Sequence, residues 1–182
     1  CVCANGHRFN SATVTKTTEK TATLVPSDTS KTTEYPSIAY LTNGNFVIVW
    51  TKEVGGHSSN RDIYARIFDT NYSPVGNEFR VDSNVDYHNT QETHYDRSVA
   101  ALSDGKFVVV WKSILNSPWS YYVYAKVFNA DGSVSKSQWE VSSGSWAMVA
   151  GLSNGKFVVV YQSGGNVWLK GYNSDHATTF VT

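Results

Sequence analysis

Apolar and polar residues alternate in short runs along this chain, and one run of ten residues occurs three times. The run begins with leucine, passes through Ser or Thr, Asn or Asp and glycine, and continues as Phe-Val into β-branched and aromatic residues. A pattern of ten residues that occurs three times indicates one supersecondary unit copied in tandem. The three copies occupy Leu41–Trp50, Leu102–Trp111 and Leu152–Tyr161.

Each copy predicts a β-hairpin. The Asn-Gly or Asp-Gly dipeptide suits the positive φ angles of a two-residue type I′ turn. The run after the turn predicts a strand buried on both faces, because it contains no polar residue. The dipeptides are Asn43-Gly44, Asp104-Gly105 and Asn154-Gly155. The expected strands are Ser37–Leu41, Ser98–Leu102 and Met148–Leu152 before the turn, and Phe46–Trp50, Phe107–Trp111 and Phe157–Tyr161 after it.

Two further strands complete each unit. In the third strand large apolar residues alternate with small or basic ones, which predicts one buried face and one wetter face. Its copies are Ile63–Phe68, Val123–Phe128 and Val167–Tyr172, with Arg66, Lys126 and Lys170 on the wetter face. The fourth strand is expected at Glu78–Val81, Trp139–Val141 and Thr179–Val181, and Phe68 to Val81 and Phe128 to Val141 are both 13 residues.

The predicted fold class is all-β, with four-stranded antiparallel units arranged as a β-propeller-like or stacked-blade array. His7–Asn10 aligns with Arg66–Asp69, so the chain is expected to start in mid-unit. Between Ser11 and Thr33, 12 of 23 residues are Ser or Thr, which favours an exposed edge segment that could carry O-linked sugar. The predicted divisions are a partial unit at 1–34, repeats at 35–83, 97–143 and 144–182, and a polar insert at 84–96.

Composition favours an extracellular protein over a cytosolic enzyme. Charged residues make up 16% of the chain, against about 25% in ordinary domains, and the difference is filled by Ser, Thr, Asn, Gly and aromatic residues. Lysine plus arginine equals aspartate plus glutamate at 15 each, so no net field attracts nucleic acid or an anionic membrane. No apolar run reaches the ~18 residues that span a bilayer. A secreted form is expected to have lost its leader, or to carry it outside this stretch.

The repeat resembles those of very large secreted or surface proteins. The pattern P-[S/A]-[I/V]-A-x-L-[S/T]-[N/D]-G-x-F-V-V-x-W, then I-Y-A-[R/Q]-x-F and G-x-E-F-x-V, is similar to repeats of RTX-type bacterial adhesins and ciliate surface proteins. It covers residues 35–182, with 1–25 as a partial unit, and the third unit departs from it at Tyr161 and Gly171. The resemblance implies an extracellular, adhesive or structural role and no enzyme. Those proteins carry many more units than this chain.

Few residues are candidates for a metal-binding or catalytic site. The insert contains Asp86, His88, Glu92, His94 and Asp96, whose side chains are of metal-binding types. The spacing fits no established ligand set, so a solvated loop is expected there, without metal or cofactor. A glycosidase would need paired carboxylates at a defined separation, and no two acids recur in the repeats in a way that indicates such a pair. The chain is therefore expected not to be an enzyme.

The two cysteines, Cys1 and Cys3, have no third partner in the chain. A bond between residues two apart is strained. A terminal bridge, unpaired thiols, a bond to another chain and a lipid-modified N-terminal cysteine all remain open. Two cysteines cannot form a four-ligand zinc site.

Several aromatic residues and one sequon are candidate surface sites. Trp50, Trp111 and Tyr161 end the second strands, where packing between units is expected rather than sugar binding. Trp119, Tyr121 and Tyr122 follow Pro118 in a unit-specific segment and are candidates for a ligand or subunit contact. Asn71-Tyr72-Ser73 is the N-glycosylation sequon, in the turn expected after the third strand.

These patterns predict a secreted or cell-surface structural or adhesive protein that is glycosylated and self-assembles. Unpaired strand edges template pairing with another chain. The N-terminal residues Thr13, Val14, Thr15 and Ala22–Val25 could therefore complete a neighbour's sheet, and head-to-tail repetition of that contact would build a filament. The alternative is a lectin-like propeller module that binds carbohydrate. No nucleic acid partner and no membrane span are expected.

Overall fold

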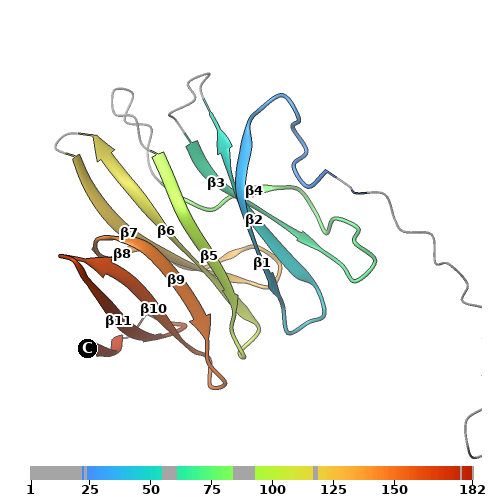
Figure 1. Ribbon diagram of the computed structural model, residues 1–182. Helices are drawn as coiled ribbons and strands as arrows, with labels where there is room; N and C mark the ends of the chain where they lie inside the picture. Colours follow the sequence, from blue (N-terminus) through green and yellow to red (C-terminus); the bar gives the residue numbers. More distant parts are fainter. Residues whose placement is uncertain are drawn as a thin grey trace, which may run out of the picture.

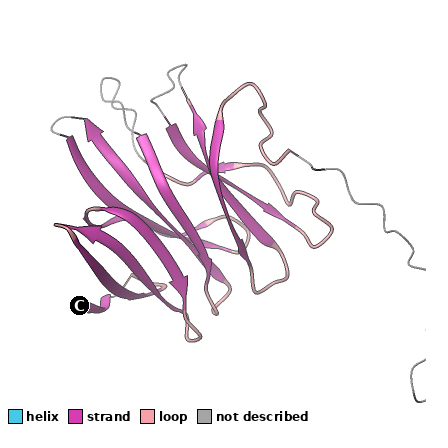
Figure 2. Cartoon of the chain, viewed as in Figure 1, coloured by secondary structure: helices cyan, strands magenta, loops and turns pink. Residues whose placement is uncertain are grey.

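The computed structural model describes residue 22 and residues 24–54, 61–83, 93–116, 119–176 and 178–181, except for the side chains of residues 93–97, 115, 116, 119 and 178–181. Throughout this part of the chain the regular secondary structure is β-strand, with no helix (Figure 2). The all-β prediction is confirmed. Cys1, Cys3, the N-terminal candidate strand residues 13–15 and insert residues 84–92 lie outside the described residues.

The described part of the chain forms twelve strands, and each overlaps one of the twelve expected from the sequence. They are β1 Thr33–Tyr40, β2 Phe46–Glu53, β3 Arg61–Phe68, β4 Phe79–Arg80, β5 Thr93–Ala101, β6 Lys106–Asn116, β7 Trp119–Asn129, β8 Val134–Ser143, β9 Ser145–Gly151, β10 Lys156–Ser163, β11 Asn166–Asn173 and β12 Thr178–Val181.

The strands form three antiparallel units of four. Unit 1 pairs in the order β1-β2-β3-β4, unit 2 in the order β5-β6-β7-β8 and unit 3 in the order β9-β10-β11-β12. A single parallel bridge between Arg61 and Thr93 joins the first two units at one edge. The β-branched and aromatic strand of each hairpin lies inside its sheet, as its composition predicts.

The hairpin turns differ from the expected two-residue type I′ turn. In unit 1, Leu41 and Asn45 pair across a three-residue loop, and the N–H of Gly44 donates to the carbonyl of Leu41 at 3.1 Å. Gly44 alone in this loop has a positive φ, of 89°, so the loop is a type I turn closed by a glycine in the left-handed region. The Asn43 side chain accepts the N–H of Asn45, which explains the recurrent Asn or Asp before glycine.

A β-bulge recurs in the first strand of every unit, and the sequence pattern did not reveal it. In each unit two residues of the first strand lie opposite the aromatic residue that ends the second strand. Tyr35 and Trp146 take the bulge position in units 1 and 3 with φ of 55° and 54°. Positive φ is uncommon for bulky residues. Its occurrence at equivalent bulge positions of two units indicates that the bulge is a structural feature of the repeat.

The three sheets pack face to face in chain order (Figure 1). One hydrophobic cluster joins unit 1 to unit 2 and contains Val47, Val49, Phe107, Val109 and Trp111. A second cluster joins unit 2 to unit 3 and contains Val108, Val110, Phe157, Val159 and Tyr161. We call the face of a unit that meets the preceding unit its front, and the face that meets the following unit its back. The described strands form an open stack and close no ring.

Candidate functional site

The junction between consecutive units is built twice from equivalent residues. On each front a ring of the second strand stacks on a ring of the third, and the pairs are Phe46–Phe68, Phe107–Phe128 and Phe157–Tyr172, with centroids 5.2–5.4 Å apart. An aromatic residue from the fourth strand of the preceding unit lies against this pair. Phe79 is 5.6 Å from Phe128, and Trp139 is 5.8 Å from Tyr172, in the favoured tilted arrangements.

A polar contact accompanies the rings at each junction. Lys126 Nζ on the front of unit 2 donates to the carbonyl of Val81 in unit 1 at 2.8 Å. Lys170 on the front of unit 3 donates in the same way to the carbonyl of Val141 at 2.5 Å. Arg66 on the front of unit 1 donates to the carbonyl of Val25 at 3.3 Å. We call this recurrent contact the valine clamp. Val25 therefore occupies, on the front of unit 1, the position that Val81 and Val141 occupy on the fronts of units 2 and 3.

The valine clamp corrects one expectation from the sequence. The basic residues of the third strand were expected on a wetter face, but Lys126 is buried and its ammonium lies 5.4 Å from the Phe128 ring. A long side chain can pack its stem on apolar surface while its ammonium binds a carbonyl. The regular position of a basic residue in an apolar strand was the signal available in the sequence.

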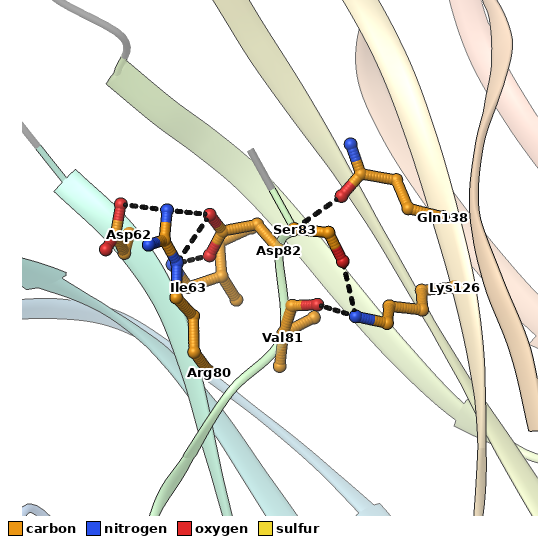
Figure 3. Close-up of polar contacts among 8 residues, drawn as sticks. All are labelled: Asp62, Ile63, Arg80, Val81, Asp82, Ser83, Lys126 and Gln138. Atoms are coloured by element: carbon orange, nitrogen blue, oxygen red, sulfur yellow. Dashed lines mark hydrogen bonds and ion pairs between the residues drawn. The ribbon is translucent and has the colours of Figure 1, made fainter. Parts of the chain in front are cut away.

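A polar cluster surrounds the clamp between units 1 and 2 (Figure 3). The carboxylate of Asp82 accepts the N–H of Ile63 at 2.8 Å and two contacts from Arg80 at 2.7 and 2.9 Å. Lys126 also donates to Ser83 Oγ at 2.7 Å, and the N–H of Ser83 donates to Gln138 at 2.8 Å. The segment after β4 is therefore tied to β3 on one side and to unit 2 on the other.

Burial changes the ionisation of the clamp lysine. Desolvation lowers the pKa of Lys126, and the negative charge of Asp82 only partly offsets that effect. Among the described residues, Lys126 donates to a carbonyl and a hydroxyl rather than to a carboxylate. Its arrangement suits a structural hydrogen bond.

The first strands of units 2 and 3, β5 and β9, come unusually close. A Cβ atom added at Gly151 in β9 would lie 2.1 Å from the carbonyl oxygen of Ala101 in β5. Only glycine fits such an approach of two backbones. The N–H of Gly155 also donates to Ser103 Oγ at 2.7 Å, so the hairpin turns of the two units are joined as well.

The aromatic residues at the ends of the second strands are core residues, as expected. Trp50, Trp111 and Tyr161 are all buried. Stacking of a sugar needs an accessible ring face, and these three buried rings do not offer one. A shallow cleft of about 340 Å³ lies between β8 of unit 2 and unit 3, and Tyr161 forms part of its lining together with Ser142, Ser163, Gly164, Asn166 and Trp168.

The predicted contact group at Trp119, Tyr121 and Tyr122 does not share one surface. Tyr121 and Tyr122 are consecutive in β7, so their side chains point to opposite faces. Tyr122 lies 6.4 Å from Tyr124 on the front, whereas Tyr121 is exposed with the Lys112 ammonium 5.9 Å from its ring. The exposed Trp146 lies 5.6 Å from the same ammonium. Trp119 begins β7, and its side chain lies outside the described part.

Asn71 lies in an exposed turn after β3. The turn is closed by hydrogen bonds between Asp69 and Ser73 and by the Asp69 carboxylate, which accepts the N–H groups of Asn71 and Ser73 at 2.9 Å. The neighbouring Tyr72 is exposed and has a φ of 66°. The sequon thus lies in an exposed surface turn.

The metal and disulfide candidates fall mostly outside the structure. Cys1, Cys3, Asp86, His88 and Glu92 are not among the described residues, and His94 and Asp96 are described only as parts of β5. Among the side chains that are described, no group of three His, Cys, Asp or Glu residues could hold a metal ion.

Comparison with family models and with curated sequences found no match. No protein-family model matches this chain, and no curated protein sequence is significantly similar to it. In the described residues no helix has the length and apolar character needed to cross a bilayer.

Proposed function

We propose that this protein is an extracellular, non-enzymatic structural or adhesive component. Its units would be arranged as propeller-like blades, and its copies would associate head to tail into a filament or surface array. The secreted or cell-surface location and the adhesive role follow from the resemblance of the repeat and from the low charge. The partners are further copies of the chain and glycans, with no nucleic acid.

One observation supports this proposal most. The stacked rings and the valine clamp occur at both junctions inside the chain, so each unit has a front and a back that fit other units of the same kind. Repeat proteins stack through nearest-neighbour interfaces of this kind and form extended surfaces. A surface built for such stacking serves assembly without any catalytic group.

Sedimentation velocity of the full chain between 1 and 200 μM, with electron microscopy of the concentrated sample, tests the proposal. We expect the mean mass to rise with concentration and elongated particles to appear. A single monomeric species over the whole range would contradict self-assembly.

We also propose that Asn71 carries an N-linked glycan. The support is its exposed turn, together with the sequon Asn71-Tyr72-Ser73. Intact mass spectrometry of material from its natural source should show hexose increments that disappear in Asn71→Gln. A mass equal to that of the bare chain would remove this part of the proposal.

A carbohydrate-binding module is the second candidate. The exposed rings of Tyr121 and Trp146 beside Lys112, and Trp168 in the shallow cleft, favour it over a purely structural role. A glycan array would decide: strong binding that is lost in Trp119→Ala or Tyr121→Ala supports the lectin, whereas an array without signal supports assembly alone.

A further inference from the structure

The back of unit 1 is covered by unit 2, and the back of unit 2 is covered by unit 3. The back of unit 3 is also an apolar sheet face, but among the described residues no further unit covers it. Val167 is 76% exposed, Met148 is 68% exposed and Leu152 is 40% exposed. Pairing of β9, β10 and β11 puts Met148 beside Val160, and Val160 beside Leu169, on this one face. A contiguous apolar face of this kind on a soluble domain marks an interaction site.

The same positions are covered in the other two units. Leu41 and Leu102 correspond to Leu152 and are buried, as are the valines that correspond to Val158 and Val160. The equivalent sets on the three backs are Ala39, Leu41, Val47 and Val49; Ala100, Leu102, Val108 and Val110; and Ala150, Leu152, Val158 and Val160. The first two sets pack against the front of the next unit. The chemistry of the third set therefore fits the front of a unit of this same type.

The front of unit 1 meets that description. It carries the stacked pair Phe46–Phe68. It also exposes Ile38 at 64% and Tyr40 at 68%, whereas the residue that corresponds to Ile38 in unit 2, Val99, is buried. Exposed apolar residues are thus present on both outer faces of the stack.

We propose that the back of unit 3 is the docking surface for the front of unit 1 of a second copy of this chain. The inference rests on the self-assembly proposed above and names the two faces that carry it. The contact continues the two junctions already present inside the chain. Ile38 of the arriving copy takes the place that Val99 has between units 1 and 2.

The arriving copy brings part of the junction with it. Its Arg66 already holds the carbonyl of Val25, and Ser27 is bonded through its N–H to Glu78 at 3.0 Å, so residues 25–27 are fixed to the front of unit 1. Val81 and Val141 have this position at the internal junctions, next to the third strand of their own units. The arriving residues 25–27 would take the corresponding position next to β11 of unit 3.

The two faces are different, so the contact is heterologous. A heterologous contact generates a ring or an open filament, whereas contact of one face with itself would give a closed dimer. This distinction makes the proposal testable by mixing variants, because a head-to-tail junction needs one intact front and one intact back.

Three variants of the full chain provide the test. Val167→Asp puts a charge on the back of unit 3, and Ile38→Asp puts one on the front of unit 1. Val134→Asp is the matched control, since Val134 is 51% exposed on β8, away from both faces. All three positions are exposed, so thermal unfolding below the association range should match that of the wild type.

Sedimentation velocity at 200 μM should show association for the wild type and Val134→Asp and monomers for the other two variants alone. An equimolar mixture of Val167→Asp and Ile38→Asp should form dimers, because one intact junction remains. Association of Val167→Asp equal to that of the wild type would overturn the docking surface and leave self-assembly standing, as would dimers of Ile38→Asp alone. A monomeric wild type would overturn self-assembly itself.

Discussion

The second strands of units 1 and 2 have almost the same sequence and different surroundings. Phe107, Val108, Val109, Val110 and Trp111 are all buried, because unit 2 lies between two other units. In the corresponding run of unit 1, Val47, Val49 and Trp50 are buried, but Phe46 and Ile48 are only half-buried. The motif thus describes a unit ready to be covered on both faces. Its neighbours decide whether it is covered.

The largest expected difference in stability between the two units comes from removing the phenyl ring at the start of the second strand, Phe46 in unit 1 and Phe107 in unit 2. Phe107→Ala should lower the free energy of unfolding by about 3–5 kcal/mol, because it leaves a cavity in a closed core. Phe46→Ala should cost about 1–2 kcal/mol, since the half-buried ring loses only part of its transfer free energy. Urea denaturation at low micromolar concentration measures both. Equal losses would show that the front of unit 1 is as closed as that of unit 2.

The sequence predicted the strands well because each strand and turn is encoded locally. Alternation of apolar residues and the position of glycine located every described strand, with bounds up to five residues from those observed, and the three copies supported one another. The turn type was wrong because Asn-Gly fits both a two-residue loop and a three-residue loop with glycine in the last position. Only the pairing of Leu41 with Asn45 distinguishes the two.

The junctions were harder to predict because they are made by residues distant in sequence. Lys126 meets Val81 across 45 residues, and Gly151 meets Ala101 across 50, so no local pattern records either contact. The bulges opposite Trp50 and Trp111 also depend on pairing with the second strand. A basic residue recurring on an apolar strand was visible in the sequence, but its partner was not.

The close approach at Gly151 gives the next largest effect. Gly151→Ala should cost about 1–3 kcal/mol, because the new methyl group meets the carbonyl of Ala101 and β5 and β9 must separate. Ala150→Val, one position away on the exposed back of unit 3, is the matched control and should change stability by less than about 0.5 kcal/mol. Thermal and urea unfolding measure the pair. Similar stabilities would mean that β5 and β9 can separate at no cost in stability.

The valine clamps should differ between the two internal junctions. Lys126→Met should cost about 2 kcal/mol, since it leaves the carbonyl of Val81 without its donor in a buried setting. Lys170→Met should cost about 1 kcal/mol, because the Lys170 side chain is less buried. The order of the two losses in urea denaturation is the test, and a larger loss at Lys170 would contradict it.

The smallest expected effect is a pH dependence of stability that arises at the junction between units 2 and 3. His176 of unit 3 lies 4.3 Å from Trp139 of unit 2, ring to ring, and burial, with the positive charge of Lys136, lowers its pKa below 6.5. The unfolded chain then binds more protons than the folded chain as the pH falls from 6.5 toward the lowered value, so stability decreases over that window and levels off below it. His176→Asn, which tolerates the φ of 76° at this position, should remove that decrease. Lys136→Met should shift its midpoint to higher pH, because the repulsive charge is gone. Melting temperatures from pH 8 to 4.5 measure the three curves, and a His176→Asn curve parallel to the wild type would place the titrating group elsewhere.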